Sequence, residues 1–143
     1  YELMLLDANM PDISAAETVK RIRSDSHITD TRMILLCSIN QKEAIPEEQA
    51  KSIEVLTKPV TDTVILKTIC RMLFPQYRAD SQFPDHDLEE LEVKRKIGGA
   101  QVLMAEDNLI NQEVAVELLC RVGIRPDVVE KGRLALDALA VKE

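Results

Sequence analysis

Three apolar runs of this chain are each followed by ionisable side chains. YELMLL is followed by Asp7, IEVLT by Lys58, and QVLMA by the acidic pair Glu106 and Asp107. Short apolar runs bounded by polar residues are typical of strands that are buried on both faces of a parallel sheet. Ligands of open α/β sheets bind beyond the carboxyl ends of such strands. The runs therefore predict an open parallel sheet with a carboxylate, a lysine and an acidic pair at one edge.

The remaining pattern of apolar residues predicts five strands that alternate with helices. Strands are expected at 1–6, 32–37, 53–57 and 102–106, all buried, and a weaker edge strand is expected at 126–130. Helical spacing predicts helices over 15–25, 62–74, 109–122 and 132–142. The segment 41–52 is a poorer candidate because Pro46 lacks the amide that an interior helical turn requires. Such alternation implies right-handed crossovers and helices on both faces of the sheet.

The overall composition indicates one globular domain. With 143 residues, 45% of them apolar, the chain can bury one core but is too short for two complete domains of this class. A net charge of -7 argues against nucleic acid as a direct partner, because phosphate binding needs a basic face. No apolar run approaches the ~20 residues of a membrane span.

The three cysteines bear on the compartment. Cys37, Cys70 and Cys120 lie in apolar surroundings without CxxC spacing, which predicts buried, reduced thiols rather than disulfides or a zinc site. The expected location is cytoplasmic. A membrane anchor elsewhere in a longer parent chain would not contradict this expectation.

Residues 75–100 differ from both flanks. Two prolines, an acidic run, a basic VKRK and Gly98–Gly99 predict an interdomain linker between residues 1–74 and 101–143. A short solvated helix in DLEELEVKRK is an open alternative within it. A fully extended linker of this length spans up to ~85 Å, so reach does not prevent the two flanking parts from meeting within one chain.

The motifs resemble those of a known family. LLDANMP, ILLCS and LTKPV resemble the C-terminal half of a two-component receiver domain, whereas VLMAEDNLINQEVAVELLCRVG and EKGRLALDAL resemble the N-terminal half, in the style of hybrid histidine kinases. This resemblance implies a flavodoxin-like, doubly wound α/β fold with a five-stranded parallel sheet. In an ordinary receiver the acidic pair comes first along the chain, but here it comes last.

This reversed order has two explanations. The chain could hold the back half of one receiver (1–74) and the front half of the next (101–143), joined by the linker at 75–100, as in a tandem-receiver hybrid kinase. The alternative is a receiver that is circularly permuted by nature. Because the halves supply one complete set of elements without duplication, we expect them to form one composite receiver. A domain-swapped homodimer would use the same contacts and stays open as the structural alternative.

The resemblance also implies a role for each polar residue. Asp7 is expected to be the phosphoacceptor, whose carboxylate attacks the phosphorus of a phosphohistidine and forms an acyl phosphate. Lys58 is expected to pair with a phosphoryl oxygen, and Ser38 to donate a hydrogen bond to the phosphoryl group. Pro59 is similar to the cis proline that turns the family's lysine into the site.

Magnesium is the cofactor that this resemblance implies. Mg²⁺ is a hard ion that prefers octahedral oxygen ligands and keeps several waters. Asp7 and Asp107 are expected to bind it directly, Glu106 through water, and the backbone carbonyl of Asn9 to complete the protein ligands.

Some positions depart from the family or lack an assigned role. Val55 stands where the family usually has a Tyr or Phe, and the absence of that ring argues against the usual hydroxyl-aromatic switch. Ser14–Ala15 stands where the family has an Asp-Gly pair, so we expect a less tight turn into the following helix. Asn111 and Gln112 look like a trait of hybrid-kinase receivers, and we expect them to face a partner or solvent rather than the chemistry.

The expected function is that of a phosphorelay receiver module in signal transduction, with a histidine kinase or a histidine phosphotransfer domain as its partner. The chain has no kinase domain of its own, although its parent is expected to be a hybrid histidine kinase, a transferase. A docking module with a vestigial pocket is one alternative. An aspartyl-phosphate phosphohydrolase is another, but such enzymes usually carry a second Asp two residues after the nucleophile as general acid, and Asn9 stands there.

Overall fold

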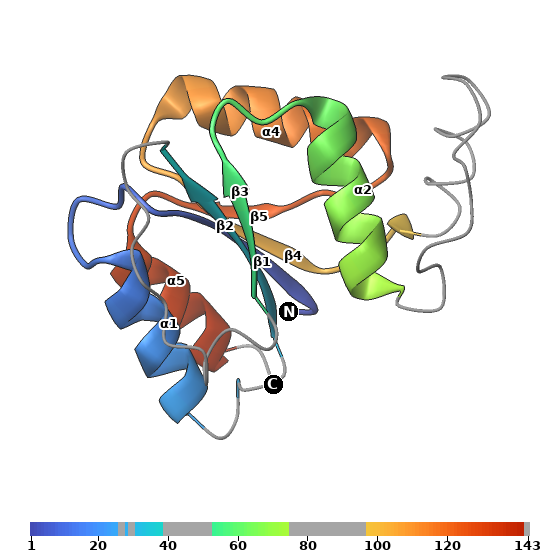
Figure 1. The fold of residues 1–143 in the computed structure, drawn as a ribbon. Coiled ribbons are helices and arrows are strands. Elements are labelled where there is room, and N and C mark those ends of the chain that lie inside the picture. The colour runs from blue at the N-terminus through green and yellow to red at the C-terminus, as the bar shows by residue number, and fades with distance from the viewer. Residues whose placement is uncertain (26–27, 29–30, 39–52, 75–96, 142–143) are drawn as a thin grey trace.

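The computed structural model describes residues 1–25, 28, 31–38, 53–74 and 97–141. Within these ranges it is an α/β fold with one all-parallel sheet of five strands and four helices (Figure 1). The strands are β1 (Leu3–Asp7), β2 (Arg32–Cys37), β3 (Ile53–Thr57), β4 (Val102–Ala105) and β5 (Asp127–Val129), and the helices are α1 (Ala15–Ser24), α2 (Asp62–Leu73), α4 (Leu109–Arg121) and α5 (Gly132–Val141). Each of these elements is predicted by the sequence to within two residues at either end.

The strands are ordered β3-β2-β1-β4-β5 across the sheet. If the strands are counted from β4 through β5 and then from β1, the order becomes the 2-1-3-4-5 of flavodoxin-like folds. The predicted flavodoxin-like α/β fold is therefore confirmed, with its elements in permuted chain order.

Helices cover both faces of the sheet, α1 and α5 on one and α2 and α4 on the other (Figure 1). Successive side chains of a strand point to opposite faces. Met4 and Leu6 of β1 accordingly join the core beneath α1 and α5, whereas Leu3 and Leu5 join the core beneath α2 and α4. All four are at most 2% exposed, which explains why this strand is an unbroken apolar run.

The two flanks of the predicted linker join in the middle of the sheet. Strand β1 pairs in parallel with β4, from Leu3 opposite Val102 to Leu6 opposite Ala105. The hydroxyl of Tyr1 adds a 2.6 Å hydrogen bond to the carboxylate of Asp127. One sheet is thus completed within a single chain.

Two elements are less buried than the sequence predicts. Strand β3 is an edge strand that pairs only with β2 among the described strands, so its residues are half-buried or exposed, and Val55 is 52% exposed. In α4, the apolar residues Ile110 and Val114 are 72% and 60% exposed, and only Leu118 and Leu119 are buried. Helical periodicity identified the helix but could not show that its first half carries its apolar side chains outside the core.

The prediction for the cysteines is also wrong in part. None of the three forms a disulfide, but only Cys37 is buried, whereas Cys70 is half-buried and Cys120 is exposed. Cys120 faces outward on α4 beside the buried pair Leu118 and Leu119. An apolar sequence neighbourhood does not place every residue of a helix on its buried face.

The folded part begins before residue 101. Ile97 is 1% exposed within the core under α2 and α4, and the amide of Gly99, at a φ of 90°, donates a hydrogen bond to the carbonyl of Gly123. The last residues of the predicted linker therefore belong to the folded domain. The rest of the linker, with the possible helix in DLEELEVKRK, and the weak helix candidate at 41–52 lie outside the described residues.

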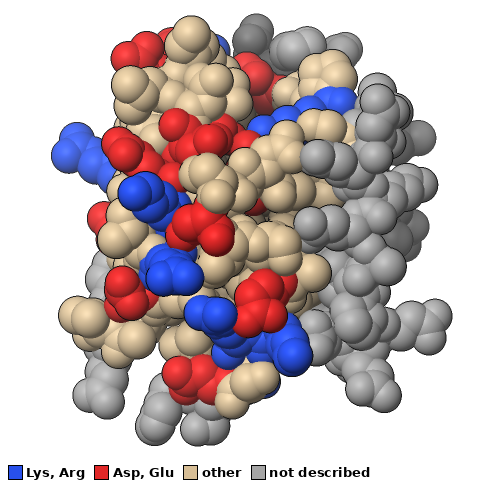
Figure 2. Space-filling view, turned by 90° about the vertical axis from the view of Figure 1, so that its left-hand side faces the viewer, with Lys and Arg blue, Asp and Glu red and all other residues tan. Residues whose placement is uncertain are grey.

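The described surface in Figure 2 carries charges of both signs. On the described part of the face in Figure 2, acidic and basic side chains are interspersed and form no continuous basic surface. Among the described helices, none has the length and apolar character needed to cross a membrane.

Candidate functional site

The candidate site lies where the chain leaves β1 and β4 in opposite directions across the sheet. From β1 the chain passes through α1 to β2, and from β4 it passes through α4 to β5 on the other side. Such a switch point leaves a crevice beyond the strand ends. Asp7 ends β1 and Glu106 follows β4, and both are buried, at 3% and 4% exposure.

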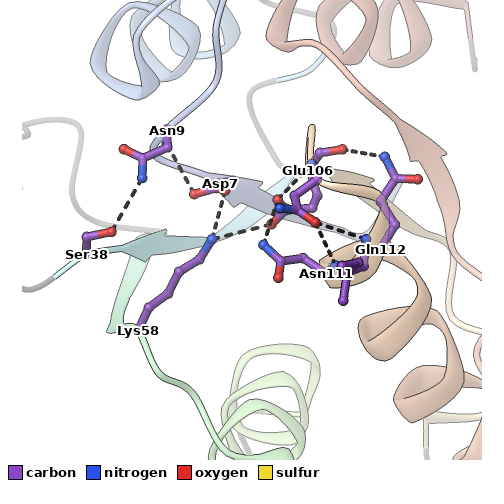
Figure 3. A network of polar contacts seen from close by, with 9 residues as sticks. Asp7, Asn9, Ser38, Lys58, Glu106, Asn111 and Gln112 are labelled. Carbon is purple, nitrogen blue, oxygen red and sulfur yellow. Dashed lines mark hydrogen bonds and ion pairs between the residues drawn. The ribbon is translucent and has the colours of Figure 1, made fainter.

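Lys58 reaches this crevice from the end of β3. Its backbone amide donates a 2.7 Å hydrogen bond to the carbonyl of Cys37, which holds the residue at the carboxyl edge. Its Nζ lies 2.8 Å from Oδ2 of Asp7 and 3.4 Å from Oε2 of Glu106 (Figure 3). The Lys58–Pro59 peptide bond is cis. Residues 48 or more positions apart thus meet in one ion-pair cluster.

The electrostatic balance at Lys58 favours its charged form. Burial by itself would lower the pKa of the lysine. The hydrogen bond and charge of Asp7, and then those of Glu106, outweigh burial, and the pKa of Lys58 is raised above its ordinary value. The lysine therefore supplies a fixed positive charge between the two carboxylates.

Three carboxylates converge in a way that fits a divalent cation. Oxygens of Asp7, Glu106 and Asp107 all lie within 4.8 Å of one another, with Asp107 the exposed member. Carboxylate oxygens are the ligands that Mg²⁺ prefers, and an exposed side leaves room for the waters that this ion keeps. The donor set and its negative charge suit Mg²⁺.

Asn9 and Ser38 lie on the other side of Asp7. The backbone amide of Asn9 donates a 3.1 Å hydrogen bond to Oδ1 of Asp7, and its side-chain amide donates a 3.4 Å bond to Oγ of Ser38 (Figure 3). The structure therefore brings all the predicted site residues to one edge of the sheet. The ligand role of the Asn9 carbonyl stays a prediction.

Residues around Glu106 form a contact set that the sequence interpretation did not expect. The side-chain amide of Asn111 donates a 3.0 Å hydrogen bond to Oε1 of Glu106, and the amide of Asn108 donates a 3.2 Å bond to the same oxygen. Gln112 donates a 2.6 Å bond to the Glu106 carbonyl. Asn111 and Gln112 thus both contact Glu106 of the site, which the sequence did not predict, while Asn111 is at the same time exposed to solvent. Asn108, which caps α4, is the signal that could have indicated this, because Asn111 lies one turn later on the same helix face.

Asp12 also escaped the sequence interpretation. It lies in the β1–α1 loop, and its carboxylate accepts hydrogen bonds from the amides of Gly132 at 3.0 Å and Arg133 at 2.9 Å, in the first turn of α5. Burial would raise the pKa of Asp12, but these hydrogen bonds outweigh it and the pKa is lowered. No sequence signal indicated this contact, because the partners lie more than a hundred residues apart.

A cavity of about 540 Å³ adjoins the site on the face covered by α2 and α4. Lys58, Glu106 and Asn111 of the site line it together with Asp62, and the other lining side chains are apolar, among them Leu5, Ile65, Met104 and Leu118. The acidic crevice therefore continues into an apolar groove between two helices.

The fold and the site together define a class. The protein is a flavodoxin-like α/β domain with an acidic, lysine-paired site at its topological switch point, an arrangement consistent with a receiver.

No family model matches the chain. Among curated proteins, it is similar to the peroxide stress-activated histidine kinase mak1 of Schizosaccharomyces pombe, with 29% identity over an alignment that is 143 positions long. The alignment covers 87% of this chain and 9% of the kinase, so the chain spans about a tenth of that protein. This weak likeness suggests a relation to two-component signalling.

Proposed function

We propose that this chain is a phosphoacceptor receiver module of a phosphorelay, which takes a phosphoryl group from phosphohistidine onto Asp7. The observation that carries the proposal is the position of Lys58 Nζ, 2.8 Å from Asp7, beside three carboxylates whose oxygens lie within 4.8 Å of one another. The likeness to a histidine kinase supports the same relay chemistry.

In the proposed reaction, a carboxylate oxygen of Asp7 forms a bond to phosphorus as the bond from phosphorus to the histidine nitrogen breaks. The nitrogen keeps the electron pair, and the phosphoryl group becomes an acyl phosphate on Asp7. Lys58 moves its ion pair from the carboxylate to a phosphoryl oxygen, and Ser38 donates a hydrogen bond to another. Both residues lie at the ends of strands that pair with each other, which fixes their separation across the site.

Asp7 and Asp107 would hold Mg²⁺, with Glu106 acting through water and the Asn9 carbonyl as a further ligand. When bound, the ion neutralises charge on the phosphoryl oxygens, which allows one anion to attack another. The single lysine leaves the three carboxylates with an excess of negative charge, so the protein's own residues favour a cation there.

The proposed domain organisation is a composite receiver built from the back half of one receiver and the front half of another. The alignment with the kinase supports this organisation. Because the alignment covers 87% of this chain, it includes parts of both halves, and these halves follow one another in the same order in the kinase. The proposed partners are a histidine kinase or a histidine phosphotransfer domain.

A second candidate function is a docking module that is not phosphorylated. The exposed apolar side chains of α4, Leu109 at 64%, Ile110 at 72% and Val114 at 60%, favour it. They lie in the half of α4 next to Glu106, beside the apolar groove. A surface of this kind is typical of a protein interface.

The deciding experiment is intact-mass measurement after incubation with acetyl phosphate and Mg²⁺. The expected result is one phosphoryl adduct that hydroxylamine removes and that is absent in Asp7→Asn and Asp107→Asn. Asp137→Asn, an exposed carboxylate on α5, is the matched control and should be phosphorylated normally. If the folded chain takes no phosphoryl group, the phosphoacceptor function is wrong and the docking module is favoured.

A further inference from the structure

Glu106 has two carboxylate oxygens in different surroundings. Oε2 lies 3.4 Å from Lys58 Nζ. Oε1 accepts hydrogen bonds from the side chain of Asn111 at 3.0 Å and from the backbone of Asn108 at 3.2 Å. Glu106 is 4% exposed, so these contacts take the place of water around its carboxylate. One oxygen is thus held by α4, while the other is paired with the lysine of the site.

We propose that Asn111 is a positioning residue for the metal site, and this inference rests on the proposed function. Its amide fixes the rotation of the Glu106 carboxylate so that Oε2 stays with the acidic cluster. The backbone amide of Asn108 donates to the same oxygen, so Asn111 adds a second donor that restricts this carboxylate. Partners that orient metal ligands in this way typically change metal affinity by 10-fold to 100-fold when they are removed.

Gln112 completes the arrangement from the next position on α4. It donates a 2.6 Å hydrogen bond to the carbonyl of Glu106, so the main chain and the side chain of this residue are held by consecutive side chains of one helix. The cap at Asn108 fixes where that helix begins, since its Oδ1 accepts from the amides of Ile110 and Asn111. The start of α4 therefore holds both the main chain and the side chain of Glu106 in place.

The test compares the Mg²⁺ dissociation constants of the unchanged whole chain and of its Asn111→Ala variant, both measured by isothermal titration in 0.15 M salt. If Asn111 only stabilises the fold, Asn111→Ala should lower the unfolding temperature and leave the Mg²⁺ affinity unchanged, because a hydrogen bond to a buried carboxylate is lost. We expect about tenfold weaker Mg²⁺ binding by the folded variant. Glu113→Ala, an exposed residue of the same helix, should change the dissociation constant less than twofold.

A double variant makes the test specific. In a Glu106→Gln background, Asn111→Ala should weaken Mg²⁺ binding no further, because the carboxylate that Asn111 orients is gone. Asn111→Ala with wild-type affinity would overturn this inference and leave the proposed function standing. If the unchanged chain binds no Mg²⁺, the proposed metal site is wrong and the inference falls with it.

Discussion

The carboxylate of Asp12 accepts a hydrogen bond from the backbone amide of Gly132, 120 residues further along the chain. It connects the loop that follows the candidate phosphoacceptor to the first turn of α5, so the two flanks of the linker are joined outside the sheet as well as within it. Arg133 donates a second bond to the same carboxylate, and Ile13 packs against Gly132. An anion at a helix N-terminus is favourable for both the exposed amides and the helix dipole.

Replacing Asp12 by Ala should destabilise the fold by about 1 kcal/mol, the usual contribution of a side chain that caps a helix start. Urea unfolding at pH 7 measures the difference. Asp137→Ala, on the exposed face of the same helix, is the control and should have little effect.

The same residue predicts a pH dependence at the acid end. Because hydrogen bonds at α5 lower the pKa of Asp12, its contribution is fully present above the ordinary value of 3.8 and is lost as pH falls through the lowered pKa. The stability difference between the wild type and Asp12→Asn should therefore be constant near neutral pH and shrink below about pH 4. A difference that grows on acidification would contradict this sign.

Gly132→Ala should destabilise the fold although alanine is the better helix former. A Cβ at this position would lie 2.7 Å from Cγ1 of Ile13 and 3.2 Å from Oγ1 of Thr18. Overpacking of this kind costs about 1–3 kcal/mol, more than the propensity gained. In a thermal unfolding series, Ile13→Ala should remove most of the additional cost of Gly132→Ala, and additive effects of the two changes would refute the proposed clash.

Lys58→Met should destabilise the fold at neutral pH by about 2 kcal/mol, because it leaves two buried carboxylates without their cation; the 26% exposure of the lysine side chain makes the cost smaller than for a fully buried pair. Mg²⁺ should raise the unfolding temperature of this variant more than that of the wild type, since it replaces the missing charge.

The same lysine predicts a pH dependence at the alkaline end. Since the pKa of Lys58 is raised, its contribution to the stability of the fold is present below the ordinary value of 10.5 and is lost as pH rises through the raised pKa. Thermal scans with and without Mg²⁺, repeated at alkaline pH, check both expectations.

Mixing two inactive variants separates a permuted monomer from a swapped dimer. In a monomer, Asp7→Asn and Asp107→Asn each lack part of the one site, and a mixture should take no phosphoryl group. In a swapped dimer, co-refolding the two variants would regenerate one intact site, because β1 and β4 would come from different chains. Pairing of β1 with β4 within one chain leads us to expect no adduct in the mixture and a monomer by light scattering.

The sequence by itself determined the elements and the candidate site residues. Apolar runs and helical spacing are local properties, and they placed β2 and β3 at their observed bounds and located α4 to within one residue. Polar residues at strand ends predicted the acidic crevice, because parallel strands share one carboxyl edge. The reversed order of the acidic pair predicted the permuted topology.

Only the tertiary structure decided which side chains meet across the chain. The contacts of Asp12 with α5 and of Asn111 with Glu106 depend on how helices lie against loops, which no periodicity encodes. The exposure of Ile110 and Cys120 shows the same limit, because an apolar residue is buried only where another element covers it. Local sequence determines the element, and packing between distant elements determines which of its faces is buried and which carries the site.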